Sequence, residues 1–188
     1  MPWVRIEVRQ TLRGERVILR PLRSEDAYGY AAAFVNDPDL GRLLGIEQDP
    51  DEQVVRGIVE RQAESAEEGK GIELAIADPV SREFWGSLLV HQVNWHHRRC
   101  EVGFWLVPDQ RRRGIATRAV SVAVSWVFTD LDMVRVEMNT TPENPSVPAL
   151  ARRLGFVQEG IQRSRNLERG QRVDLIWFGL LRDEWAAD

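Results

Sequence analysis

The sequence predicts an α/β (α+β) fold in which one mixed, mostly antiparallel sheet is flanked by helices. Three observations indicate this class. Apolar residues recur at helical spacing in some stretches, as in residues 52–63, whereas apolar and polar residues alternate in others, as in residues 71–77. Strand-like and helix-like segments follow one another along the chain, and turns rich in glycine and proline separate them.

The first part of the chain is expected to form a strand and two helices. Residues 14–22 have strand character, and residues 24–37 follow as a helix with Ser24 at its N-cap and acidic residues in its first turn. The stretch 49–52 resembles a capping box with Pro50 at the first helical position, so a second helix is expected to open there.

Strand signals dominate the middle of the chain. The expected strands are residues 71–77, 83–95 and 100–107. Pro108 ends the last of them, because proline cannot donate to a strand ladder. Strand geometry places four residues of this last strand on one face: Glu101, Gly103, Trp105 and Val107.

The remaining segments alternate between helix and strand. We expect a buried helix at 116–128, a strand at 134–139, a helix at 144–156 and a hairpin at 160–181. Gly155 is the expected C-cap of the second of these helices. Pro148 would remove a backbone donor from a helix that started at Asn144, so a later start with Ser146 as the cap is the alternative.

Composition limits the classes of protein that the chain can represent. Its 188 residues fit one domain, which we expect to span 1–188, and 43% hydrophobic with 29% charged residues is typical of a globular protein. The net charge of −4 disfavours a nucleic-acid partner or a membrane surface. There is one cysteine, no signal-peptide-like start and no paired Cys/His spacing, so we expect a cytoplasmic protein without a metal site.

One short stretch, FWLVPDQRRRGIAT at 104–117, carries the strongest functional signal. A strand, a glycine-bearing loop and a buried helix expose backbone N–H groups at a helix N-terminus, where they attract phosphate. Gly114 lets the backbone approach an anion, and arginines add charge-assisted bonds. The loop matches neither GxxxxGK[ST] nor GxGxxG, and a solvated cationic turn is the alternative reading.

Arg111, Gly114 and Ala116 match the pattern [QR]xxGx[GA], so the loop resembles motif A of the GNAT acyltransferase superfamily. The resemblance to its RimJ/RimL-like N-acetyltransferases extends through four segments in the family's order: 16–27, 100–119, 135–160 and 174–185. It implies the GNAT fold in a single domain, with acetyl-CoA as co-substrate. It also admits a homodimer, since dimers are common in that group.

The resemblance implies which residues contact acetyl-CoA. Backbone N–H groups from 112 to 117 would cap the pyrophosphate, the strand end at 105–107 would pair with the pantetheine arm, and the Leu106 N–H would polarise the thioester carbonyl. Asn144 corresponds to an asparagine that contacts pantetheine, although Asn-Pro is also an ordinary N-cap. The full expected set is Trp105, Leu106, Val107, Arg111, Arg112, Arg113, Gly114, Ile115, Ala116, Thr117 and Asn144.

The catalytic side chains are less clearly marked. Glu101 and Glu137 are both candidates for the general base, and the alternative for each is a carboxylate paired with arginine. Ser146 is a weaker candidate for assisting the departing thiolate. Three positions depart from the side chains that the family uses for catalysis: Val147, Ala151 and Asn166.

These observations predict an acetyl-CoA-dependent N-acetyltransferase that acts by direct attack in a ternary complex. The acceptor is a primary amine, either a protein N-terminus or a small molecule. The alternative is a catalytically impaired acyl-CoA-binding regulatory module, which the three departures would suit.

Overall fold

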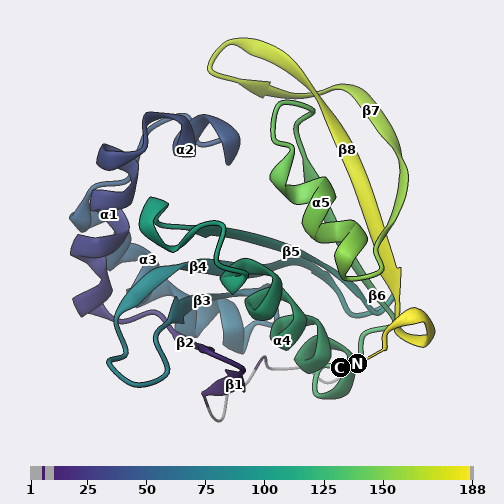
Figure 1. The fold of residues 1–188 in the computed structure, drawn as a ribbon, viewed down its shortest axis with the longest axis horizontal. Helices are drawn as coiled ribbons and strands as arrows, with labels where there is room; N and C mark the ends of the chain where they lie inside the picture. Colours follow the sequence, from purple (N-terminus) through teal and green to yellow (C-terminus); the bar gives the residue numbers. More distant parts are fainter. Residues whose placement is uncertain (1–5, 7–10, 187–188) are drawn as a thin grey trace.

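A computed structural model describes residue 6 and residues 11–186 of the chain, so most of the N-terminal stretch considered above lies outside the described residues. Eight strands form one sheet in the order β1-β2-β3-β4-β5-β6-β8-β7 (Figure 1). Neighbouring strands are antiparallel except β5 and β6, which are parallel. The strands are β1 Leu12–Gly14, β2 Val17–Pro21, β3 Ile72–Ala77, β4 Phe84–Asn94, β5 Arg99–Leu106, β6 Arg135–Thr140, β7 Val157–Glu168 and β8 Gln171–Leu181.

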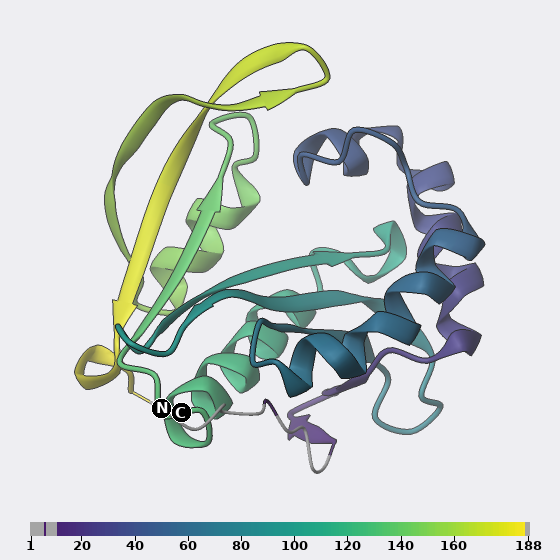
Figure 2. The same ribbon diagram turned by 180° about the vertical axis from the view of Figure 1, so that it is seen from behind.

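Helices cover both faces of this sheet, as the two opposite views show (Figures 1 and 2). The helices are α1 Ala27–Asn36, α2 Pro38–Leu43, α3 Glu52–Glu67, α4 Ile115–Thr129 and α5 Ser146–Arg153. Helices α4 and α5 lie on one side and α1 and α3 on the other. The mixed, mostly antiparallel sheet flanked by helices is the predicted fold class, which is thereby confirmed.

Two hydrophobic clusters hold the layers together. The larger one joins the α4 face to the sheet and includes Val120, Val124 and Leu88, all fully buried. The smaller one lies under α1 and centres on Phe34 and Trp105. Burial of such side chains is the main favourable term in folding, at about 1.5–3 kcal/mol for each large one.

The helix starts differ from those expected. Ser24 does not cap α1, because it opens a short 3₁₀ turn, Ser24–Asp26, and Asp26 occupies the cap position. The Asp26 carboxylate accepts the Arg23 N–H at 2.9 Å and binds Arg20 in a buried ion pair of 2.7 Å. In α3 the cap is Asp51, whose side chain accepts the Val54 N–H at 2.8 Å. Pro50 therefore lies before that helix and not at its first position.

Helix α5 starts later than Asn144, as in the alternative drawn from Pro148. It begins at Ser146, so Pro148 falls in the first turn, where a backbone N–H would have no helical acceptor. Ser146 is the first helical residue and not the cap; the side-chain oxygen of Asn144 accepts the Ser146 N–H at 3.2 Å. The chain turns directly after α5 at Gly155, whose φ of +82° agrees with the expected C-cap.

Where β5 and β6 meet, the sheet is only briefly paired. The parallel register covers three pairs, from Arg99↔Arg135 to Glu101↔Glu137. Beyond them β5 runs on to Leu106 and β6 to Thr140, and the two strands diverge. The edge of β5 that faced β6 is therefore open from Val102 onward, and the loop that leads into α4 follows directly.

Within the described part of the chain, no helix is both long and apolar enough to span a bilayer. The same residues contain no group of three or more His, Cys, Asp or Glu side chains placed to hold a metal ion.

Candidate functional site

The loop between β5 and α4 gathers unpaired backbone donors. Arg112 and Gly114 both have left-handed φ values, of 58° and 76°, which turn successive N–H groups toward one side. The Arg118 N–H is the first to find a helical acceptor, at the Gly114 carbonyl. In this fully described loop, the N–H groups of 112–117 have no backbone acceptor, so the sequence-predicted cradle has six donors available to an anion.

The arginine side chains around this loop have different partners. Arg111 donates from Nε to the Leu106 carbonyl at 2.9 Å, and its Nη2 lies 2.6 Å from Asp37 Oδ2. Arg113 donates to Gln110 at 2.9 Å, whereas Arg112 is exposed. The three adjacent charges therefore do not act as one cluster, and Arg111 faces the strand end.

Arg118 joins the loop although the sequence pattern did not single it out. Its Nη1 lies 2.5 Å from the place that a Cβ on Gly114 would occupy, so the guanidinium stands over the loop. Its Nε pairs with Glu15 at 3.4 Å. The signal was available in principle, since a residue four positions after Gly114 lies one helical turn into α4.

The main-chain hydrogen bonds between β5 and β4 determine which backbone groups of β5 point toward its open edge. The Val107 N–H donates to the Trp85 carbonyl at 2.9 Å, so Val107 and, two residues back, Trp105 exchange their main-chain bonds with β4. Leu106 lies between them, opposite Gly86, and its N–H and carbonyl point away from β4. Phe104 has the same orientation. Of the expected pantetheine contacts at 105–107, only Leu106 presents its main chain to the open edge.

The side chain of Trp105 anchors this strand end from the α1 face. Its ring contacts three aromatic side chains edge-on, with centroid distances of 4.8, 5.4 and 5.7 Å to Tyr30, Phe34 and Phe84. Edge-to-face pairs of this kind stabilise by about 0.5–1.5 kcal/mol beyond their burial. Trp105 thus serves the rigidity of the strand.

The two candidate bases have different surroundings. Glu101 is 9% exposed and accepts one bond, from Asn139 Nδ2 at 3.1 Å. Burial raises the pKa of Glu101, and the nearby charge of Glu137 acts in the same direction. Glu137 instead accepts from Arg99 at 2.7 Å and from Arg135 at 2.8 Å. Two guanidinium groups therefore occupy the carboxylate of Glu137.

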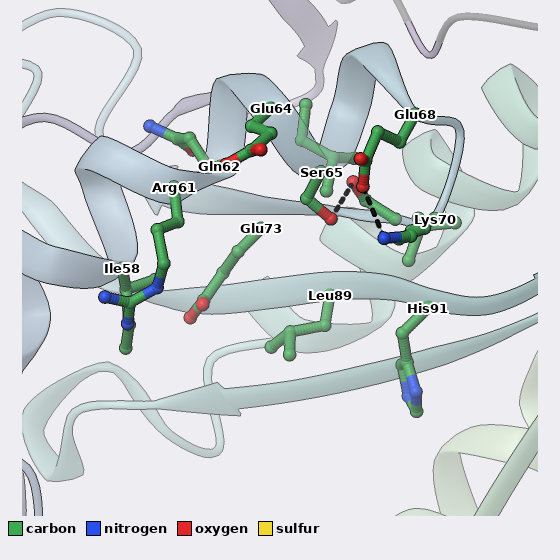
Figure 3. A pocket seen from close by; sticks show the side chains of 13 residues that line it. Ile58, Arg61, Gln62, Glu64, Ser65, Glu68, Lys70, Glu73, Leu89 and His91 are labelled. Carbon is green, nitrogen blue, oxygen red and sulfur yellow. Dashed lines mark hydrogen bonds and ion pairs between the residues drawn. The ribbon is translucent and has the colours of Figure 1, made fainter.

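An open groove of about 520 Å³ lies between helix α3 and strands β3 and β4, on the face of the sheet that α3 covers (Figure 3). Glu73 lines it and accepts from Tyr30 at 3.0 Å and from Ser87 at 2.5 Å; burial raises the pKa of this carboxyl. His91 lines the same groove and is the register partner of Glu101. Burial lowers the pKa of His91, which favours its neutral form. Glu73 carried no sequence motif and was not predicted.

Two positions of α5 that depart from the family's catalytic side chains face the core. Val147 packs against the main core and Ala151 is fully buried, so a larger polar side chain at 151 would need a different core. Asn144 uses Oδ1 to cap α5, while its Nδ2 has no partner among the described contacts. Ser146 is exposed.

An open strand edge with an outward N–H thus lies next to a loop whose N–H groups, at a helix N-terminus, can bind an anion. Residues 16–157 match the family model described as acetyltransferase (GNAT) domain. The chain belongs to this family and is an N-acetyltransferase.

Named relatives agree with this assignment. The chain is 27% identical over 171 residues to YoaA of Bacillus subtilis strain 168, an uncharacterized N-acetyltransferase, covering 91% of this chain and 96% of YoaA. It is 25% identical over 177 residues to YdaF of the same strain, named as a candidate ribosomal N-acetyltransferase, with 93% and 96% covered. The fold matches that of Mycobacterium smegmatis RimJ, solved in complex with CoA-disulfide, at a TM-score of 0.84, with 23% identity and with 93% of this chain and 87% of that chain covered.

Proposed function

We propose that this chain transfers the acetyl group of acetyl-CoA to a primary amine by direct attack, with both substrates bound together. One observation carries the proposal: the outward N–H of Leu106 lies at the open edge of β5, directly before the loop with six free N–H donors. Gly114 has a left-handed φ of 76°, and a Cβ there would meet the guanidinium of Arg118, so glycine lets both the loop amides and Arg118 approach a diphosphate. Arg118 and the loop amides would hold the phosphates, and the Asn144 amide is available to pantetheine.

Glu101 is the base in this proposal. The amine is bound as its ammonium form, loses one proton to Glu101 directly or through water, and forms a C–N bond with the thioester carbon. The Leu106 N–H stabilises the negative oxygen of the adduct. The nitrogen of the adduct releases its second proton to solvent, the C=O bond re-forms as the C–S bond breaks, and solvent protonates the departing thiolate. Glu137 supports this site as the partner of Arg99 and Arg135.

The acid that protonates the thiolate is solvent, with Ser146 as the nearest predicted alternative. Ser146 is exposed at the start of α5, and the positions of the usual family side chains are Val147 and Ala151. A coenzyme A thiol has a pKa near that of cysteine, about 8.5, so its thiolate is a good leaving group near neutral pH. Catalysis can then depend on positioning and on the N–H donor.

The acceptor that we propose first is the α-amine of a protein. Its pKa of about 8 makes deprotonation at pH 7 cost about 1 kcal/mol, against about 4.5 kcal/mol for a lysine amine. A single carboxylate, that of Glu101, suits the smaller cost. The name of the relative YdaF points to the same acceptor class. The cytoplasmic location, the single domain over 1–188 and the homodimer stay predictions.

A thiol-release assay with peptides of different N-terminal residues and with small amines tests the function. We expect acetyl-CoA-dependent release with at least one peptide amine, and a loss of acetyl-CoA affinity in Gly114→Glu. Tight binding of acetyl-CoA without release from any acceptor would instead support the regulatory module. Unchanged affinity in Gly114→Glu would contradict the role of the loop.

A further inference from the structure

We propose that Arg111 is a positioning residue, which holds Leu106 in the orientation that stabilises the oxyanion and links it through Asp37 to helices α1 and α2. This inference rests on the proposed function of the Leu106 N–H. The sequence motif alone suggested that Arg111 is a phosphate ligand; the inference assigns it a different role.

The contacts of Arg111 support this role. Its Nε donates to the Leu106 carbonyl at 2.9 Å, and its Nη2 meets Asp37 Oδ2 at 2.6 Å. Its backbone N–H is also used, by the Pro108 carbonyl at 3.1 Å. The guanidinium therefore has partners on two sides that are both protein groups.

Leu106 needs a side chain to fix its backbone because β6 has already diverged from β5 at this point and does not pair with it. Its flanking residues are fixed, Trp105 by its aromatic cluster and Val107 by its N–H bond to Trp85. The N–H and carbonyl of Leu106 itself point to the open edge, where no strand pairs with them. In an extended residue these two groups point the same way, so a bond that fixes the carbonyl also fixes the direction of the N–H.

Asp37 connects this strand end to the other side of the molecule. Its N–H donates to the Ala33 carbonyl at the end of α1, and its Oδ1 accepts the Asp39 N–H at 3.3 Å as the N-cap of α2. The side chain of Asp37 is 14% exposed and that of Arg111 is 38% exposed, so solvent screens this pair only in part. Asp37 thus connects the end of α1 and the start of α2, through an ion pair, to the guanidinium that bonds the Leu106 carbonyl.

Two variants test the inference with acetyl-CoA labelled with ¹³C at the carbonyl. Arg111→Lys cannot bind Leu106 and Asp37 together, and Asp37→Asn keeps the cap oxygen of α2 but removes the charge. In the wild type the infrared carbonyl band of bound acetyl-CoA should lie below that of the free thioester. In both variants we expect the band to return toward the free value and kcat to fall about 10- to 100-fold, since loss of one whole oxyanion donor costs about 10²–10³-fold.

The Kd of acetyl-CoA should stay within about twofold in both variants, because the phosphate loop is unchanged. Arg56→Lys is the matched control, since it alters an exposed arginine–carboxylate pair on α3 and should change none of the three readouts. A tenfold weaker Kd with an unshifted band would make Arg111 a phosphate ligand and overturn the inference. A wild-type band at the free value would instead contradict the oxyanion role of Leu106, and with it the mechanism proposed above.

Discussion

At the scale of single residues, the roles of the two glutamates follow from their partners and not from their positions in the sequence. Both residues lie where β5 and β6 diverge, and the sequence makes both of them candidates for the general base. Glu101 has one amide donor and a raised pKa, whereas Glu137 has two guanidinium groups. The arginine partners of Glu137 come from positions 99 and 135, which only the parallel register brings together.

Replacing Glu101 should therefore impair catalysis, while acetyl-CoA binding persists. We expect Glu101→Gln to lower kcat by about 10²–10⁴-fold, the usual contribution of a positioned base. In the wild type kcat/KM for the amine should decline as pH falls through the raised pKa of Glu101, and this acid limb should be absent in the variant. Steady-state rates between pH 5 and 9 give the measurement, and a retained acid limb in Glu101→Gln would assign it to another group.

Glu101→Gln should raise the stability of the protein at neutral pH, although it lowers kcat. A carboxyl whose folded pKa is raised binds its proton more tightly in the folded state, so the folded protein gains stability below that pKa and loses it as pH rises through it. At pH 7 Glu101→Gln removes this cost and should raise the melting temperature. The increase over the wild type should shrink as pH falls and vanish well below the ordinary glutamate pKa of about 4.3, where Glu101 is protonated in both the folded and the unfolded state; calorimetry across this range checks this.

Arg118 gives a prediction for the cofactor half of the site. Because its guanidinium stands over Gly114, Arg118→Gln should raise the Kd of acetyl-CoA about tenfold and reduce the salt dependence of binding. The acceptor KM should stay the same. Calorimetric titrations at two salt concentrations would show this, and an unchanged Kd would mean that Arg118 serves only its pair with Glu15.

At the scale of elements, the close contact between β4 and β5 shapes the active strand. A Cβ on Gly86 would lie 2.1 Å from the Trp105 carbonyl oxygen and 2.8 Å from the Leu106 Cα. Gly86→Ala must therefore push β5 away from β4 at Leu106. We expect a loss of at least about 1–3 kcal/mol in the free energy of unfolding, together with a lower kcat. Gly103→Ala is the comparison for stability, since its nearest contact would be an ordinary 3.6 Å to His91, and equal losses in urea unfolding would refute the argument.

The sequence allowed most elements to be predicted, and the failures have local causes. Periodicity located the main strands and helices, because one face of each is buried and leaves a pattern. Helix α2 was missed because Pro38–Leu43 is too short to show a helical repeat. The caps of α1 and α3 were misplaced because Ser24 opens a 3₁₀ turn before α1, and because Asp51 lies two residues after the first capping signal.

The site was predictable only where backbone geometry follows from local sequence. The loop before α4 was such a case, since a glycine before a buried helix fixes the free N–H groups. Glu73 and Arg118 escaped notice because their importance depends on the groove and on the turn of α4. Similarly, only the pattern of main-chain hydrogen bonds with β4 shows that Leu106 is the one residue of 105–107 whose N–H and carbonyl point outward.

At the scale of the whole molecule, two parts of the sheet meet at a short seam. Strands β1 to β5 join β6 to β8 through only three residue pairs, and the candidate site lies where this seam opens. A second set of contacts joins the two parts beyond the opening. Arg42 in α2 pairs with Glu143 before α5, and Arg169 at the hairpin tip bonds Glu47 and Asp49 through its backbone and side chain, at 3.0 and 3.1 Å.

These bridging contacts should influence the binding of the acceptor and not the stability of the fold. Exposed ion pairs contribute about 0–1 kcal/mol each, so the double variant Arg42→Gln/Arg169→Gln should melt within a few degrees of the wild type. Without the bridge, we expect faster amide exchange in 38–48 and 166–172 and an acceptor KM several-fold higher, while the Kd of acetyl-CoA stays unchanged. Because salt screens exposed charges over about 8 Å at physiological strength, added salt should raise the acceptor KM of the wild type and leave the variant unaffected. Faster exchange with an unchanged acceptor KM would show that the acceptor does not pass beneath this bridge.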